Sequence, residues 1–122
     1  MSSAFHGLRT VVYMVPDVEA AKTWYAGILG IAPYFDTPYY VGFNVGGYEL
    51  GLHPEPDNTI RGNNQGAYWG VDDVAVTMEK LIAAGATEYE KLADVGEGII
   101  IASVKDPWGN IFGVIYNPHF KL

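Results

Sequence analysis

The fold is decided by the stretch Lys105-Asp106-Pro107-Trp108-Gly109-Asn110, which continues into Ile111-Phe112-Gly113-Val114-Ile115. Asp106 can bond to its own backbone two residues further on, Pro107 presets φ, and Gly109 tolerates a positive φ, so this stretch is typical of a turn. The flanking segments 98–104 and 111–116 are rich in the β-branched and aromatic residues that strands favour. The sequence therefore predicts a hairpin, and the second strand of that hairpin carries a glycine, Gly113, near its middle.

This hairpin ends one of two halves of the chain that follow the same order. The second half is predicted to be a strand, a helix and three strands: Gly66–Val71, Val74–Ala84, Thr87–Leu92, Gly98–Val104 and Ile111–Tyr116. The first half repeats this order, with strands at Leu8–Val15, Ile31–Phe35, Tyr39–Val45 and Tyr48–His53 and a helix between Asp17 and Gly30. We predict a single domain over residues 1–122, with one module at 6–53, a linker at 54–64 and a second module at 65–118. Neither module is expected to be stable alone, because each is too small to bury its sheet.

Each predicted helix begins at an aspartate and carries one apolar stripe. Asp17 and Asp73 are good N-cap residues. Apolar residues then recur at helical spacing in both segments: Val18, Ala21, Trp24, Tyr25 and Ile28 in the first, and Val74, Met78, Leu81 and Ile82 in the second. Each stripe is expected to pack against the sheet of its own module.

Composition excludes several classes of function. Fourteen acidic residues against seven basic ones give a net charge of −7, which disfavours nucleic acid and anionic membranes as partners. Cysteine is absent, which excludes disulfides, thiolate catalysis and cysteine-ligated metals. No apolar run is long enough to span a membrane, and the N-terminal residues do not form a signal peptide. We therefore expect a cytoplasmic protein that binds neither nucleic acid nor membranes.

The repeated motifs resemble those of the vicinal oxygen chelate superfamily, which includes glyoxalase I, extradiol dioxygenases, and fosfomycin- and bleomycin-resistance proteins. The motifs are Val15-Pro16-Asp17-Val18-Glu19-Ala20-Ala21-Lys22-Thr23-Trp24-Tyr25 with Leu29-Gly30, then Val71-Asp72-Asp73-Val74 with Ala83-Ala84-Gly85-Ala86, and finally Asp106-Pro107-Trp108-Gly109-Asn110. The resemblance implies an α+β fold. In that fold, tandem βαβββ modules form a curved mixed sheet around a cleft, with the helices on the outer face. The resemblance also implies a homodimer.

Metalloenzymes of that superfamily place His, Gln or Glu ligands on the first and last strands of each half. Carried onto this sequence, those positions are Thr10, Gly51, Gly66 and Gly113. Glycine has no side-chain donor, and one threonine hydroxyl is a poor ligand for a divalent metal. The resemblance thus implies the fold, while these residues predict that no metal and no other cofactor is bound.

Strand alternation places further side chains on the face of the glycines, where a ligand could fill the space that the glycines leave. The expected ligand-binding residues are Thr10, Val12, Met14, Glu49, Gly51, His53, Gly66, Tyr68, Trp108, Ile111 and Gly113. Ile115 belongs to the same wall, and Tyr39, Tyr40 and Phe43 are candidates to close its mouth. On this interpretation Gly113→Leu fills the pocket and leaves folding intact.

Glu49 and His53 are the candidate catalytic groups, each as a lone general base. They lie four residues apart on one strand, about 13 Å at about 3.3 Å per residue, which is too far for both to bind one metal. Glu49 can also serve as the partner of a cationic ligand, and His53 can equally be a residue of the rim.

Three functions remain open from the sequence. The first is a metal-free binding protein, similar to the bleomycin-resistance branch, for a small aromatic or cationic molecule. The second is a glyoxalase-type lyase or isomerase, or a dioxygenase-like enzyme, with non-standard ligands. The third is a structural or interaction domain whose cleft is plugged by Tyr68 and its neighbours.

Overall fold

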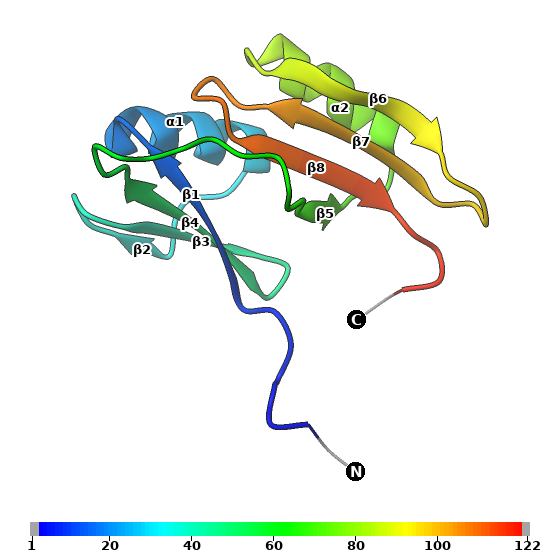
Figure 1. The fold of residues 1–122 in the computed structure, drawn as a ribbon, viewed down its shortest axis with the longest axis horizontal. Helices are drawn as coiled ribbons and strands as arrows, with labels where there is room; N and C mark the ends of the chain where they lie inside the picture. Colours follow the sequence, from blue (N-terminus) through cyan, green and yellow to red (C-terminus); the bar gives the residue numbers. More distant parts are fainter. Residues whose placement is uncertain (1–2, 121–122) are drawn as a thin grey trace. The chain divides into compact units, whose positions relative to one another are not determined.

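The computed structural model describes residues 3–120, and the chain divides between Asn58 and Thr59 into two compact units (Figure 1). The first unit contains β1 (Thr10–Val15), α1 (Val18–Leu29), β2 (Phe35–Asp36), β3 (Val41–Val45) and β4 (Tyr48–Pro54). These strands form one sheet in the order β1-β4-β3-β2, in which β1 and β4 are parallel and the other neighbours are antiparallel.

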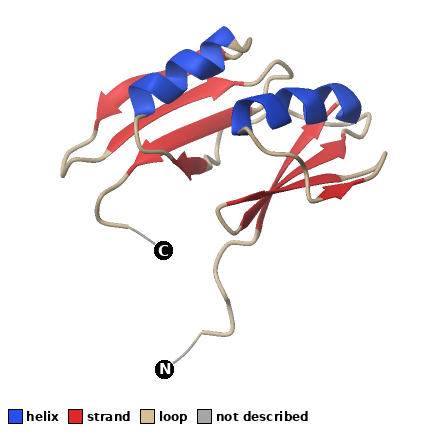
Figure 2. Ribbon diagram, turned by 180° about the vertical axis from the view of Figure 1, so that it is seen from behind, coloured by secondary structure: helices blue, strands red, loops and turns tan. Residues whose placement is uncertain are grey.

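The second unit repeats this arrangement. It contains β5 (Tyr68–Gly70), α2 (Val74–Ala83), β6 (Thr87–Asp94), β7 (Ile100–Lys105) and β8 (Ile111–Tyr116). Its sheet has the order β5-β8-β7-β6, with a parallel pair β5–β8 and antiparallel pairs elsewhere. The predicted α+β class with mixed strands is therefore confirmed. Figure 2 shows each helix on one face of its own unit's sheet.

The helix starts are those that the sequence predicts. The Asp17 side chain accepts a hydrogen bond from the Ala20 N–H at 3.1 Å, and the Asp73 side chain accepts one from the Val76 N–H at 3.0 Å. Such bonds satisfy N–H groups that the first helical turn leaves without partners. Gly30 ends α1 in the left-handed conformation, with φ of 72°, which glycine adopts at little cost.

The core of each unit lies between its helix and the inner face of its sheet. In β1, Tyr13 and Val15 are 6% and 0% exposed, whereas the alternating Val12 and Met14 are 44% and 38% exposed. The predicted burial is wrong for two residues. Phe43 is fully buried, so it belongs to the core instead of the mouth of a cleft, and Ile82 is exposed instead of lying in the apolar stripe of α2.

The hairpin predicted around Asp106 is confirmed. The Asp106 side chain accepts hydrogen bonds from the N–H groups of Trp108 at 2.9 Å and Asn110 at 2.8 Å, and Gly109 has φ of 88°. The resulting register places Ser103 of β7 opposite Gly113 of β8.

Two predicted strands are misplaced. The segment 31–35 is not a strand, since β2 covers only Phe35–Asp36 and Pro33 lacks the N–H that pairing requires. The strand predicted from Gly66 is shorter and begins at Tyr68. Within residues 3–120, no helix is long and apolar enough to cross a membrane.

Candidate functional site

Glu49 lies at the centre of a polar cluster on the open face of the first unit. It is on β4, opposite Thr10 of parallel β1 and opposite Asn44 of antiparallel β3. Because side chains two apart in a strand share a face, Glu49, Gly51 and His53 all belong to the face away from α1. The register therefore brings Thr10 and Glu49 together, as predicted from alternation.

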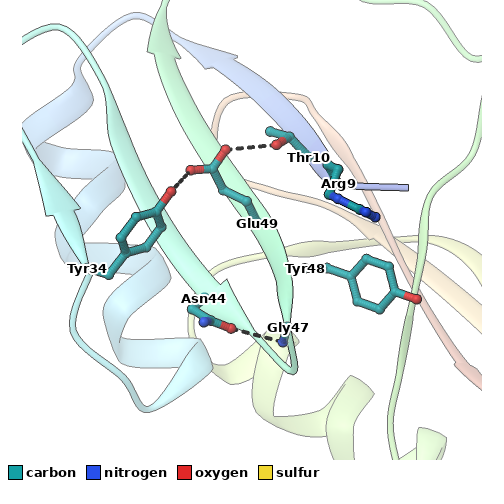
Figure 3. A pocket seen from close by; sticks show the side chains of 7 residues that line it. All are labelled: Arg9, Thr10, Tyr34, Asn44, Gly47, Tyr48 and Glu49. Atoms are coloured by element: carbon teal, nitrogen blue, oxygen red, sulfur yellow. Dashed lines mark hydrogen bonds between the residues drawn. The ribbon is translucent and has the colours of Figure 1, made fainter. Parts of the chain in front are cut away.

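Three hydroxyl groups donate hydrogen bonds to the Glu49 carboxylate. Thr10 Oγ1 and Tyr40 Oη each donate to Oε1 at 2.8 Å. Tyr34 Oη donates to Oε2 (Figure 3). A carboxylate has about four acceptor positions on its two oxygens. These three donors therefore leave about one position on Oε2 for a further donor.

This cluster determines the ionisation of its members. Hydrogen bonds, first from Tyr34 and then from Tyr40 and Thr10, lower the pKa of Glu49 despite the opposing effect of partial burial. Burial, followed by the hydrogen bond to Glu49, raises the pKa of Tyr40 to about 12. The pKa of Tyr34 is also raised by its bond to Glu49. At neutral pH the cluster therefore consists of one carboxylate and neutral hydroxyl donors, which makes Glu49 a weak base.

A shallow depression with about 270 Å³ of free volume opens beside Glu49. It is lined by Arg9, Thr10, Tyr34, Asn44, Gly47, Tyr48 and Glu49 (Figure 3). The β3–β4 turn forms one edge, where the Gly47 N–H donates to Asn44 Oδ1 at 2.9 Å. The depression thus offers a carboxylate, a guanidinium, an amide and two phenol rings to a molecule that enters it.

The glycines of this sheet are covered by the side chains that surround Glu49. A Cβ on Gly51 would lie 2.7 Å from Cζ of Tyr40. A Cβ on Gly42 would lie 2.6 Å from Oε2 of Glu49 and 3.0 Å from the Tyr34 ring. The expectation of open space above Gly51 is therefore wrong, because Tyr40 occupies that space.

Gly113 in the second unit is covered in the same way. A Cβ there would lie 2.6 Å from the Ala67 carbonyl oxygen and 2.7 Å from the Tyr68 ring. Tyr68 Oη donates to Glu90 Oε1 at 2.9 Å, which raises the pKa of Tyr68. The buried Ser103 hydroxyl donates to the same oxygen at 2.8 Å. Each unit therefore has a tyrosine over its last-strand glycine and a glutamate that holds the tyrosine hydroxyl.

The contact with Ala67 also overturns the expectation for Gly113→Leu. That substitution was expected to fill an empty pocket and leave folding intact, but its Cβ would collide with backbone. A backbone atom moves only if the strand moves. At Gly66, by contrast, a Cβ would be in ordinary contact with Tyr68 at 3.4 Å.

The remaining predicted residues lie outside the Glu49 cluster. Val12 and Met14 are exposed on the same face of β1, and Ile111 and Ile115 are partly exposed on β8. Trp108 lies in the β7–β8 turn and is partly buried. His53 is exposed near the end of β4, and its Nδ1 is 2.6 Å from the Pro54 carbonyl oxygen, as expected for a residue of the rim.

Several residues of this site were not singled out from the sequence. They are Arg9, Tyr34, Gly42, Asn44, Gly47 and Tyr48. Of these residues, Gly42 could have been recognised from the sequence through the Gly46-Gly47 turn. A hairpin that closes at this turn pairs Gly42 with Gly51, which leaves a two-glycine gap for aromatic side chains to fill.

The positions of the superfamily's metal ligands do not fit a metal ion in this chain. Gly51, Gly66 and Gly113 have no donor atoms, and the hydroxyl of Thr10 is bonded to Glu49. Among residues 3–120, no group of three or more His, Cys, Asp or Glu side chains is arranged to hold a metal. The residues present at these positions thus disagree with the chemistry that the resemblance implies.

Comparisons with known proteins agree on the fold. The family model described as "Glyoxalase/Bleomycin resistance protein/Dioxygenase superfamily" matches residues 7–114. A glyoxalase-related enzyme from Fulvimarina pelagi is 23% identical, with a TM-score of 0.79 over 97% of this chain and 93% of that one. A lactoylglutathione lyase from Agrobacterium tumefaciens is 17% identical, with a TM-score of 0.72 over 98% of this chain and 100% of that one. No curated protein matches the chain. Structural likeness at such low identity shows a common fold and does not define the activity.

Proposed function

The chain belongs to the Glyoxalase/Bleomycin resistance protein/Dioxygenase superfamily, and we propose that it binds a small aromatic molecule without a metal ion. The observation that carries this proposal is the Glu49 carboxylate, which is held by three hydroxyls at the edge of an open depression. A ligand site needs a few polar groups in fixed positions beside apolar and aromatic walls. Glu49 and its tyrosines supply both.

The side chains of the depression indicate which chemical groups a ligand should carry. The acceptor position that remains on Glu49 Oε2 suits a hydrogen-bond donor, and the negative charge favours a cationic one. Tyr34 is 64% exposed and can stack with an aromatic ring or a cation. The net charge of −7 assists the capture of a cation from solution. Arg9, which lines the same depression, suits a polar acceptor elsewhere on the ligand.

Binding fits this site better than catalysis. A general base is most effective when its pKa lies near the working pH, but the hydrogen bonds lower the pKa of Glu49. His53, the other candidate base, is exposed at the rim beside Pro54. The lowered pKa instead keeps Glu49 charged, which is the state that a cationic partner requires.

A titration of the chelator-dialysed protein tests the proposal. A panel of aromatic cations, neutral aromatic molecules and aromatic anions is first screened by thermal shift, and hits are measured by calorimetry. We expect the aromatic cations to bind, and Glu49→Gln to weaken their binding by about tenfold or more, because a charge-assisted contact is lost. Asp57→Asn is the matched control, since it removes one negative charge from an exposed position of the same unit. Equal affinity of wild type and Glu49→Gln, or binding only after metal is added, contradicts the proposal.

A second function is favoured by the covered glycines. Tyr40 over Gly51 and Tyr68 over Gly113 fill the space where a cleft floor was expected, as a structural or interaction domain requires. If no compound of the panel binds while Tyr40→Ala unfolds the protein, this alternative accounts for the tyrosines better than ligand binding does.

A further inference from the structure

A second depression, in the unit that begins at Thr59, differs in charge from the first, whose lining contains both a guanidinium and a carboxylate. It has about 250 Å³ of free volume at the β7–β8 turn, and it is lined by Arg61, Gly62, Asn63, Tyr89, Lys105, Gly109 and Ile111. Two of these seven residues are cationic and none is a carboxylate. In a chain with fourteen acidic and only seven basic residues, such a lining is unusual enough to need an explanation.

Tyr89 positions two of the groups that line this depression. The Lys105 Nζ lies 5.2 Å from the centroid of the Tyr89 ring, within the range of a cation–π contact. The Asn63 amide donates a hydrogen bond to Tyr89 Oη at 3.2 Å. Within residues 3–120, Lys105 forms no salt bridge that would neutralise its charge. The ammonium is therefore held in place without a carboxylate partner.

The turn positions the second cation. Arg61 Nε donates to the Trp108 carbonyl oxygen at 3.1 Å. The Arg61 side chain also lies against Gly109, whose Cβ would come 3.9 Å from Nε. These contacts fix the stem of a side chain that the sequence assigns to a linker.

The internal repeat shows that the two depressions occupy corresponding places. Lys105 pairs with Ile111 across the β7–β8 hairpin, as Asn44 pairs with Glu49 across the β3–β4 hairpin. The apolar Ile111 thus stands where the first unit has its carboxylate, and Lys105 stands where it has an amide. The corresponding hairpin pair is therefore an amide and a carboxylate in the first unit, and an ammonium and an alkyl side chain in the second.

We propose that this second depression binds a small molecule through an oxyanion, either a carboxylate or a phosphate, which Lys105 and Arg61 hold together with the Asn63 amide. An ammonium and a guanidinium that converge on one hollow form strong charge-assisted hydrogen bonds to such a group. Ile111 and the Tyr89 ring provide apolar contact for the rest of the molecule. This site is independent of Glu49, so it can exist whether or not the proposed function is correct.

The test follows backbone amide signals by proton–nitrogen correlation NMR during titration with sodium phosphate or sodium acetate. Ionic strength is kept constant, and a parallel titration uses sodium chloride. We expect saturable shifts at Gly62, Asn63, Lys105 and Gly109 with phosphate, with acetate or with both, but not with chloride. The two arms show which oxyanion the site prefers.

Matched variants decide whether the shifts report a real site. Lys105→Gln is expected to weaken binding by about fivefold or more, because one of two charged contacts is lost. Lys80→Gln makes the same change of net charge on an exposed position of α2 and should leave the affinity within about twofold of the wild type. The proposal is overturned if neither oxyanion gives a saturable shift, if chloride reproduces the shifts, or if the two variants weaken binding equally.

Discussion

At the scale of single residues, Tyr40 contacts both Gly51 and Glu49 in the first unit. Its ring fills the space above Gly51, and its hydroxyl donates to the Glu49 carboxylate at 2.8 Å. Loss of its proton would place a phenolate beside a carboxylate in a partly buried position. Burial, the hydrogen bond to Glu49 and this neighbouring charge, in that order, are therefore the reasons that the pKa of Tyr40 is raised to about 12.

The raised pKa predicts how stability depends on alkaline pH. A tyrosine whose folded pKa exceeds its unfolded value of 10.0 stabilises the fold fully below pH 10, and this contribution is lost as pH rises through about 12. We expect the difference in unfolding free energy between wild type and Tyr40→Phe to shrink over this interval. Urea denaturation at a series of pH values measures it. Difference absorbance of the two folded proteins should show one tyrosine that ionises near pH 12. Ionisation near pH 10 contradicts the hydrogen-bonded position of Tyr40.

The sequence indicated part of the cluster around Glu49 but missed Tyr34, and it did not give the arrangement of the side chains. Alternation along β1 and β4 placed Thr10, Glu49 and Gly51 on one face. It could not show that Tyr34 and Tyr40 reach back over the sheet, because Tyr34 comes from the irregular chain just before β2 and Tyr40 from the loop between β2 and β3. The direction of a tyrosine in a loop depends on what fills the neighbouring volume, and local spacing does not contain that information.

At the scale of elements, β8 and the chain that enters β5 approach each other closely at Gly113. The Gly113 N–H donates to the Ala67 carbonyl at 3.0 Å, and the same carbonyl oxygen would lie 2.6 Å from a Cβ on Gly113. The glycine therefore permits a close pairing of two parallel neighbours. It does not leave a vacancy for a ligand.

Gly113→Ala should accordingly destabilise the protein by about 1–3 kcal/mol, because the new methyl group forces β5 and β8 apart. The matched control is Gly70→Ala in β5, where a Cβ would have no heavy atom within 4 Å. That substitution should be neutral or stabilising by up to about 1 kcal/mol, since it restricts the unfolded chain. Chemical denaturation of both variants measures the contrast. Equal stabilities of the two variants are inconsistent with the close approach at Ala67.

The elements themselves were predictable where local chemistry defines them. The helices begin at Asp17 and Asp73 because each aspartate satisfies N–H groups of the first turn. The β7–β8 hairpin follows from Asp106 and Gly109 in the same way. Prediction failed for segment 31–35, because an edge strand depends on its partner more than on its own residues.

At the scale of the whole molecule, the two units share one architecture but differ in the side chains at corresponding positions. Both units have the same strand order and a tyrosine over the last-strand glycine. Yet Glu49 in one unit corresponds to Ile111 in the other, and Asn44 corresponds to Lys105. The sequence reveals the repeat through its capping motifs. Recognition of these paired positions also required the strand register, which the structure supplies.

The residues at the superfamily's ligand positions in both units determine how the protein should respond to metal removal. The positions that correspond to the superfamily's ligands are Thr10, Gly51, Gly66 and Gly113, and they lack the donors that a divalent ion needs. We therefore expect that dialysis against a chelator leaves the melting temperature unchanged, and that added zinc, nickel, manganese or iron(II) does not raise it. A specific site at a hundredfold excess of metal over its Kd would stabilise the fold by about 2.7 kcal/mol. For a chain of this size that corresponds to a rise of roughly 8 °C or more, well above the error of a thermal scan. Elemental analysis of the purified protein provides the second measurement. Stoichiometric metal together with such a rise would show that ligands outside these four positions hold an ion, and the metal-independent function proposed for Glu49 would then be wrong.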